Sequence, residues 1–201
     1  MIFSFLFKKK RSKAIEVKGT AVKSTVEFVS KNFPKQYDSW FANLPAETQK
    51  IYKDRIDYAK WYPIKCAYLD PIDKIVELFY DNDPKIGGEA MGLFAAEISL
   101  KKIYKVFISI ATTKYIISRA PTIISTFFNP IKVKIVDKSK TSMTVVISEF
   151  TEITVAAEYR IASWNKFAIE MTNANNVVYE VISSIANGDK KLAIKYTWDL
   201  Q

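Results

Sequence analysis

The chain has 201 residues and a formal net charge of +9, because 30 lysines and arginines face 21 acidic residues. This length suits one well-buried domain, and a 49% hydrophobic content with few glycines and prolines excludes a disordered or fibrous protein. There is no histidine and only one cysteine, Cys66. An intramolecular disulfide, a histidine-dependent triad, a histidine-ligated haem and a zinc site of histidines or several thiolates are therefore excluded. Carboxylate sites for Mg²⁺ or Ca²⁺ stay open, but no EF-hand or Walker motif is present.

The excess of basic over acidic residues favours an anionic partner. The alternative is a basic surface that contacts only solvent. Base-specific contacts rely heavily on arginine. The chain has only Arg11, Arg55, Arg119 and Arg160. Nucleic acid is therefore not the expected partner.

The N-terminus reads "MIFSFLFKKKRSK", with the apolar residues before the basic ones, which is the reverse of a secretory signal. One hypothesis is a peripheral membrane or partner contact made by Phe3, Phe5, Leu6 and Phe7, with Lys8, Lys9, Lys10 and Arg11 on anionic headgroups. The alternative is a short arm that packs on the domain or a partner subunit, or frays. We predict an arm over residues 1–18 and a single domain over 19–201.

Helical spacing of apolar residues dominates the first half of the chain. Prolines and first-turn acids mark several helix starts. The expected helices cover residues 19–33, 37–44, 45–61, a segment opening at Asp70-Pro71, 84–119 with an interruption at Thr112-Thr113, and a last piece from Pro121 to about Phe128.

The second half alternates as half-buried strands do. Strands are expected at 131–137 and 142–150, a helix at 152–173, and strands at 176–186 and 191–200. Asn187-Gly188 favours a tight hairpin, because both residues tolerate a positive φ. The fold class is therefore α+β, with an N-terminal helical bundle packed on an antiparallel four-stranded sheet and a β-β-α-β-β C-terminal half.

Several local features are candidate sites. Trp61-Tyr62-Pro63 either lines a pocket for an aromatic or acyl ligand or packs a corner. Cys66 is expected to be a small buried hydrophobe; the alternative, an acyl chain on its thiol, is only what the family resemblance given below implies. The small residues from Gly87 to Ala96 make room for a ligand or partner helix, or else allow close packing inside the monomer. Glu89 and Glu97 lie near one helix face, and solvated or lysine-paired glutamates are favoured over an acid–base pair.

Six strings, in this order and spacing, carry a resemblance over nearly all of the chain after residue 18. They are "GTAVKSTVEFV", "LPAE", "WYPI", "KIGGEAMGLFAAEISLKKIYKVF", "RAP" and "ANGDKKLAIKYTW". The chain resembles an uncharacterised bacterial family first recognised in myxobacteria. That family belongs to a wider group with the vinyl-4-reductase-like sensors, the haem-NO-binding domain and the TRAPP vesicle-tethering subunits.

The resemblance implies a Gly188-Asp189 turn that, in the vinyl-4-reductase-like sensors, is flanked by metal-holding cysteines. The matching positions here are Ser184 and Leu192, which argues against a metal. In the haem-binding branch a histidine holds the iron, so haem is not expected either, and no cofactor is expected.

The resemblance also implies an apolar ligand pocket and a homodimer formed through the helices. Our candidate pocket residues are Trp61, Tyr62, Cys66, Gly88, Met91, Ala95 and Tyr104. The expected function is a non-enzymatic cytoplasmic sensor or assembly module that binds an apolar small molecule or lipid, with a peripheral position on the inner face of the membrane left open. The alternative is a scaffold that docks on a membrane-associated or multi-protein assembly without a small ligand.

Overall fold

The computed structural model describes residues 14–103 and 113–200. Three predicted features therefore lie outside the described residues: the candidate membrane contact at residues 3–11, the pocket residue Tyr104 and the interruption at Thr112. The helical first half comprises β1 (Glu16–Lys18), α1 (Gly19–Asn32), η1 (Pro34–Gln36), α2 (Tyr37–Ala42), α3 (Ala46–Lys53), β2 (Trp61–Pro63), η2 (Lys65–Leu69), α4 (Asp70–Phe79), α5 (Pro84–Ile103) and α7 (Thr113–Ser125).

The second half comprises β3 (Phe128–Asn129), β4 (Lys132–Val136), β5 (Ser142–Ser148), α8 (Val155–Glu170), β6 (Ala174–Ser183) and β7 (Leu192–Leu200). Strands β4 to β7 form an antiparallel four-stranded sheet in the order β4-β5-β7-β6. This confirms the α+β class and the β-β-α-β-β half.

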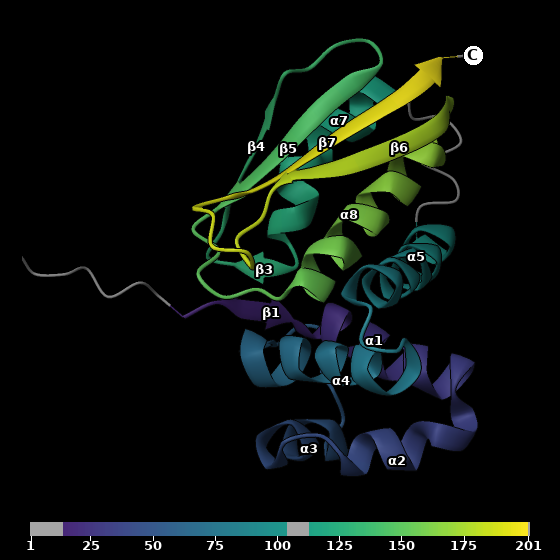
Figure 1. Cartoon of the computed structure of the whole chain (residues 1–201), viewed down its shortest axis with the longest axis vertical. Helices are drawn as coiled ribbons and strands as arrows, with labels where there is room; N and C mark the ends of the chain where they lie inside the picture. The colour runs from purple at the N-terminus through teal and green to yellow at the C-terminus, as the bar shows by residue number, and fades with distance from the viewer. Residues whose placement is uncertain (1–13, 104–112, 201) are drawn as a thin grey trace, which may run out of the picture.

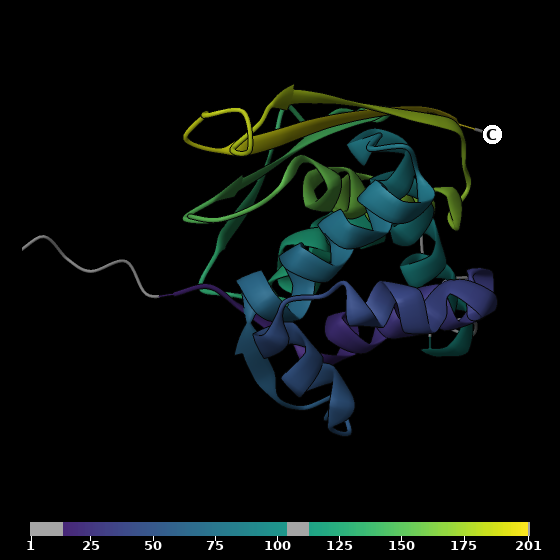
Figure 2. The ribbon, with the colours of Figure 1, turned by 60° about the horizontal axis from the view of Figure 1, so that its bottom comes forward.

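The molecule is layered, with the sheet on one side and the helices beneath it (Figures 1 and 2). Helix α8 lies under the sheet, and α5 packs along α8 in the most extensive helix–helix contact of the described chain. Helices α1 and α4 follow, with α2 and α3 farthest from the sheet. No helix in the described ranges is both long and apolar enough to cross a membrane.

A second, smaller sheet in the order β2-β1-β3 was not predicted from the sequence. Val17 pairs with Tyr62 on one side and with Phe128 on the other. Ile15 and Val17 are both buried, so the body of the protein already includes the residues just before α1.

The third predicted helix was too long. It ends at Lys53 and not at Trp61, and Trp61–Pro63 is a strand. Two causes act together: Pro63 disfavours a helical conformation at Tyr62, and the backbone of β1 offers the segment antiparallel partners instead.

The predicted break at Pro121 was also wrong, since α7 runs through this proline to Ser125. Burial of Ala120 and Ile124 on either side of Pro121 holds the helix across it. Phe128 belongs to β3 and not to the end of a helix.

The β6–β7 connection is longer than the tight Asn-Gly hairpin we expected. Strand β6 ends at Ser183 and β7 begins at Leu192. Gly188 has a positive φ of 100°, whereas Asn187 does not lie in that region. The Asp189 side chain closes the loop, because its Oδ2 accepts hydrogen bonds from the Ser183 hydroxyl (3.0 Å) and the Ser184 amide (2.8 Å).

Candidate functional site

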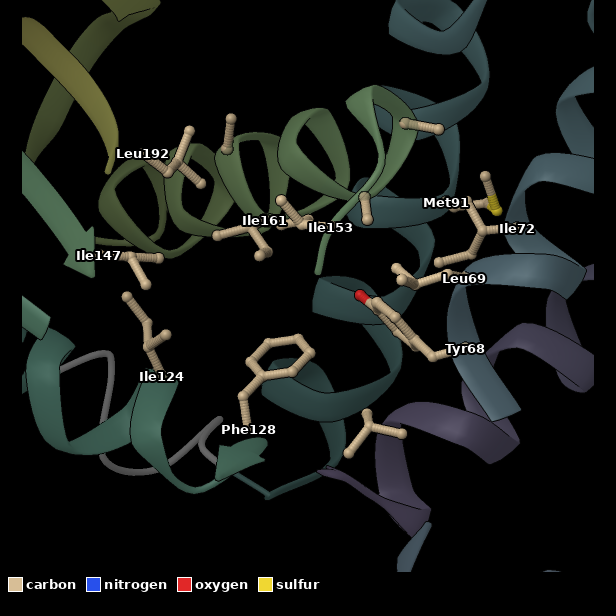
Figure 3. Packing of buried hydrophobic residues seen from close by; sticks show 14 of the residues in the cluster. Tyr68, Leu69, Ile72, Met91, Ile124, Phe128, Ile147, Ile153, Ile161 and Leu192 are labelled. Carbon is tan, nitrogen blue, oxygen red and sulfur yellow. The ribbon is translucent and has the colours of Figure 1, made fainter. Parts of the chain in front are cut away.

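A cavity of about 250 Å³ lies where α1, α5, α7 and α8 meet. Its walls are mostly apolar, with Tyr68, Ile124, Phe128 and Ile161 among them. Figure 3 shows these four side chains facing one another from η2, α7, β3 and α8. Ligand sites in proteins usually have about 300–1,000 Å³. At about 250 Å³ this cavity lies just below that range and admits only a small molecule.

Arg160 is the unusual residue of this cavity. Its side chain comes from α8 and is only 3% exposed. The guanidinium donates from Nη1 to Thr25 Oγ1 (2.8 Å) and from Nη2 to Ser24 Oγ (2.7 Å), and it lies 4.8 Å from the centre of the Tyr68 ring. A buried charge is costly unless it is paired or well hydrogen-bonded. Here the partners are two neutral hydroxyls and an aromatic ring.

Polar groups of α5 and α8 lie beside Arg160 in the cavity wall. Trp164 Nε1 donates to Ser99 Oγ (3.3 Å), and this hydroxyl donates to the Ala95 carbonyl (2.7 Å). Asn165 is 4% exposed, and its Nδ2 has no hydrogen-bond partner within the described residues. The amide lies near the Tyr196 hydroxyl without reaching hydrogen-bond geometry.

The small residues of α5 allow close packing inside the monomer. A Cβ at Gly88 would lie 2.4 Å from the Ala156 carbonyl oxygen, and one at Gly92 would lie 2.3 Å from the Arg160 carbonyl oxygen. Both glycines therefore let α8 approach α5. Only Ala95, one turn further on, lines the cavity.

The other predicted pocket residues lie elsewhere. Trp61 and Tyr62 are in β2, where Lys18 Nζ sits 4.6 Å from the Trp61 ring centre and the Tyr62 hydroxyl accepts from the Asp57 amide (3.0 Å). Met91 is fully buried in the core. The structure thus brings Ala95, but not these residues, to the cavity, and their ligand-binding role stays a prediction.

Of the two glutamates on α5, Glu89 is half-buried and forms no ion pair with a lysine in the described part of the chain. Its Oε1 accepts a hydrogen bond from the Tyr179 hydroxyl of β6 (2.5 Å). Burial, and then the neighbouring Glu89, raise the pKa of the Tyr179 phenol. This contact ties α5 to the sheet.

Cys66 is half-buried in η2, with its thiol 3.8 Å from the Pro63 carbonyl oxygen. Burial raises the pKa of this thiol, so less thiolate is present at pH 8 than in an unfolded chain. We expect iodoacetamide to modify Cys66 several-fold more slowly in the native protein than in the same protein in urea, as followed by intact mass. The native rate should keep rising at a pH where the rate in urea has levelled off. Equal rates in the two states would contradict this.

A second buried charge, Glu158, holds the β6–β7 loop. Glu158 is 1% exposed, and its carboxylate accepts from the Ser184 hydroxyl (2.6 Å) and from the Ala186 amide (3.1 Å). Ser184 thus occupies the position where the resemblance places a cysteine, and it is bonded to a carboxylate. Among the described residues no group of three or more histidine, cysteine or acidic side chains is arranged to hold a metal ion.

No protein-family model matches the chain, and no curated protein matches it in sequence. Solved structures do share its fold. An H-NOX protein from S. oneidensis in the Fe(II)NO ligation state is similar, with a TM-score of 0.63 and 12% identity, over 90% of this chain and 99% of that one. The Fe(II) unliganded H-NOX protein from K. algicida has a TM-score of 0.59 and 11% identity, over 92% and 97%.

A third similar structure, named for the modulation of haem redox potential by porphyrin distortion, has a TM-score of 0.56 and 11% identity, over 90% of this chain and 99% of that one. The residues present here do not fit a haem. The chain has no histidine, and Cys66 does not line the cavity. Tyr68 does line it, but burial raises the pKa of its phenol and disfavours the phenolate that would bind iron. A volume of about 250 Å³ is also far below that of a porphyrin. The chain therefore shares the H-NOX fold, and among its described residues the cavity of about 250 Å³ contains Arg160 and is lined by no histidine or cysteine.

Proposed function

We propose that this protein is a non-enzymatic sensor or assembly module that binds a small apolar molecule in the cavity between α1, α5, α7 and α8. The observation that carries the proposal is the cavity itself, which extends from the surface near Tyr58 into the core and has mostly apolar walls. Preformed concave sites with a few polar groups are the usual form of small-molecule sites. Likeness to H-NOX proteins over nearly the whole chain supports the proposal at the level of the fold.

The proposal extends to the family, the cellular location and the oligomeric state that the sequence led us to expect. We propose that the chain belongs with the bacterial family first recognised in myxobacteria, in the group of vinyl-4-reductase-like sensors and TRAPP subunits. The strings around Gly19–Val29, Lys85–Phe107 and Ala186–Trp198 support this placement. We further propose that it works as a cytoplasmic homodimer.

Native mass spectrometry of the purified protein, followed by denaturation and organic extraction, tests the proposal. We expect an added mass that disappears on denaturation, and a protein mass that reports the dimer. Replacing Ala95 with phenylalanine, which projects into the cavity, should remove most of the added mass. The same substitution at Ala42, which is exposed on α2, should leave it unchanged. A bare protein mass in the wild type would contradict ligand binding and favour the scaffold alternative.

A further inference from the structure

The cavity contains a positive charge that no acidic side chain neutralises. Every Asp and Glu of the sequence falls within the ranges that the structure describes. None of the ion pairs found there includes Arg160. Glu27 lines the same cavity but forms no ion pair with the guanidinium. Burial without a counter-ion is unfavourable for an arginine. An anion that enters the cavity therefore binds favourably, because it supplies the counter-ion that the guanidinium lacks.

The guanidinium is also held in a fixed orientation with donors to spare. Ser24 and Thr25 accept from its two Nη atoms. These bonds use two of the five N–H donors of an arginine. The Tyr68 ring lies against the guanidinium. A ligand group that binds here therefore meets a preorganised cation, which lowers the entropic cost of binding.

A second residue of the cavity wall also has an unsatisfied polar group. Asn165 lines the cavity, is 4% exposed and leaves its Nδ2 donor without a partner in the described part of the chain. Buried donors are rarely left unsatisfied in folded proteins. Arg160 and Asn165 both come from α8, so one helix places two polar side chains in the cavity wall.

We infer that the ligand carries a carboxylate, which Arg160 binds, and that its remainder is apolar. This inference rests on the proposed function. The planar guanidinium matches a carboxylate in geometry as well as in charge. The other walls, with Ile98, Ile124, Phe127 and Trp164, are suited to hydrocarbon. At roughly 30 Å³ for each non-hydrogen atom, taken from the volume of a water molecule, the cavity of about 250 Å³ holds about eight such atoms. Fatty acids with four to six carbon atoms have this size and character.

The test compares each acid with its own amide, which has nearly the same shape and no charge. Butanoate, pentanoate and hexanoate, with their primary amides, are titrated into the purified full-length protein by isothermal titration calorimetry. We expect at least one acid to bind about 10- to 100-fold more tightly than its amide, the range for hydrogen bonds to charged groups. The preference should disappear in Arg160→Gln and should weaken in Arg160→Lys, which keeps the charge but loses the planar fork.

Lys23→Gln is the matched control. It removes the same charge from the cavity margin while leaving the guanidinium in place, so the preference for the acid should persist. The comparison of each acid with its amide in the wild-type protein remains informative even if Arg160→Gln fails to fold. Equal affinities for an acid and its amide in the wild type would overturn the carboxylate inference and leave the proposed function intact. If neither member of any pair binds, the carboxylate inference is overturned, and the added mass in native mass spectrometry decides the proposed function separately.

Discussion

Replacing Gly88 with alanine is expected to destabilise the protein by about 3 kcal/mol. The added Cβ would lie 2.4 Å from the Ala156 carbonyl oxygen. That oxygen belongs to the backbone of the first turn of α8, so the clash is relieved only if α5 and α8 move apart. Alanine is the better helix former by about 1 kcal/mol, and a loss of stability would therefore report on packing alone.

Urea denaturation followed by circular dichroism measures this change through the transition midpoint. Gly87→Ala is the matched control on the same helix, because its nearest neighbours are side-chain atoms of Val76 and Tyr80, which can shift. We expect a smaller loss there. Gly92→Ala should resemble Gly88→Ala, since its Cβ would meet the Arg160 carbonyl oxygen at 2.3 Å. A midpoint for Gly88→Ala at or above that of the wild type would contradict the close approach of the two helices.

A double variant with Gly88→Ala and Gly92→Ala tests whether the two clashes are relieved by the same movement. Gly88 and Gly92 meet the same stretch of α8, so separation of the helices by the first alanine relieves part of the second clash. We therefore expect the combined loss to be smaller than the sum of the two single losses. Full additivity would mean that each site relaxes locally.

Replacing Glu158 with alanine should also cost about 3 kcal/mol, because it leaves the Ser184 hydroxyl and the Ala186 amide without their buried acceptor. Glu158→Gln should cost less, since its amide keeps one acceptor and adds a donor that the Ser184 hydroxyl can accept. Both losses are measured from the urea midpoint. Hydrogen exchange adds a local measurement, because the Ala186 amide should exchange faster in the alanine variant than in the wild type.

The control lies on the same helix. Glu170 pairs with Lys166 at 3.4 Å on the surface, and its removal should change stability by less than about 0.5 kcal/mol. If Glu158→Ala is as harmless as Glu170→Ala, the carboxylate does not hold the β6–β7 loop. Unchanged exchange at Ala186 would lead to the same conclusion.

Local pattern in the sequence determined most of the elements. Alternation predicted β4, where Val133 and Ile135 are less exposed than the lysines beside them. Asp70-Pro71 predicted the start of α4. These signals succeed because proline geometry and the burial of one face act on neighbouring residues, which a sequence displays directly. The α+β class followed from the order of such elements.

The tertiary structure decided what the sequence left open. Gly88 and Gly92 face the backbone of α8, whereas Ala95, in the same run of small residues, faces the cavity, and no local pattern separates these environments. Trp61–Pro63 became a strand because β1, more than forty residues earlier, pairs with it.

Arg160 attracted attention in the sequence only as one of four arginines. Its importance comes from burial among Ser24, Thr25 and Tyr68, which lie on elements distant in the chain. Composition by itself excluded the chemistries that require histidine, because the absence of a residue type can be read from the sequence without a structure. Where a charge is buried, and what neutralises it, depends on contacts between distant segments, and only the folded chain decides these.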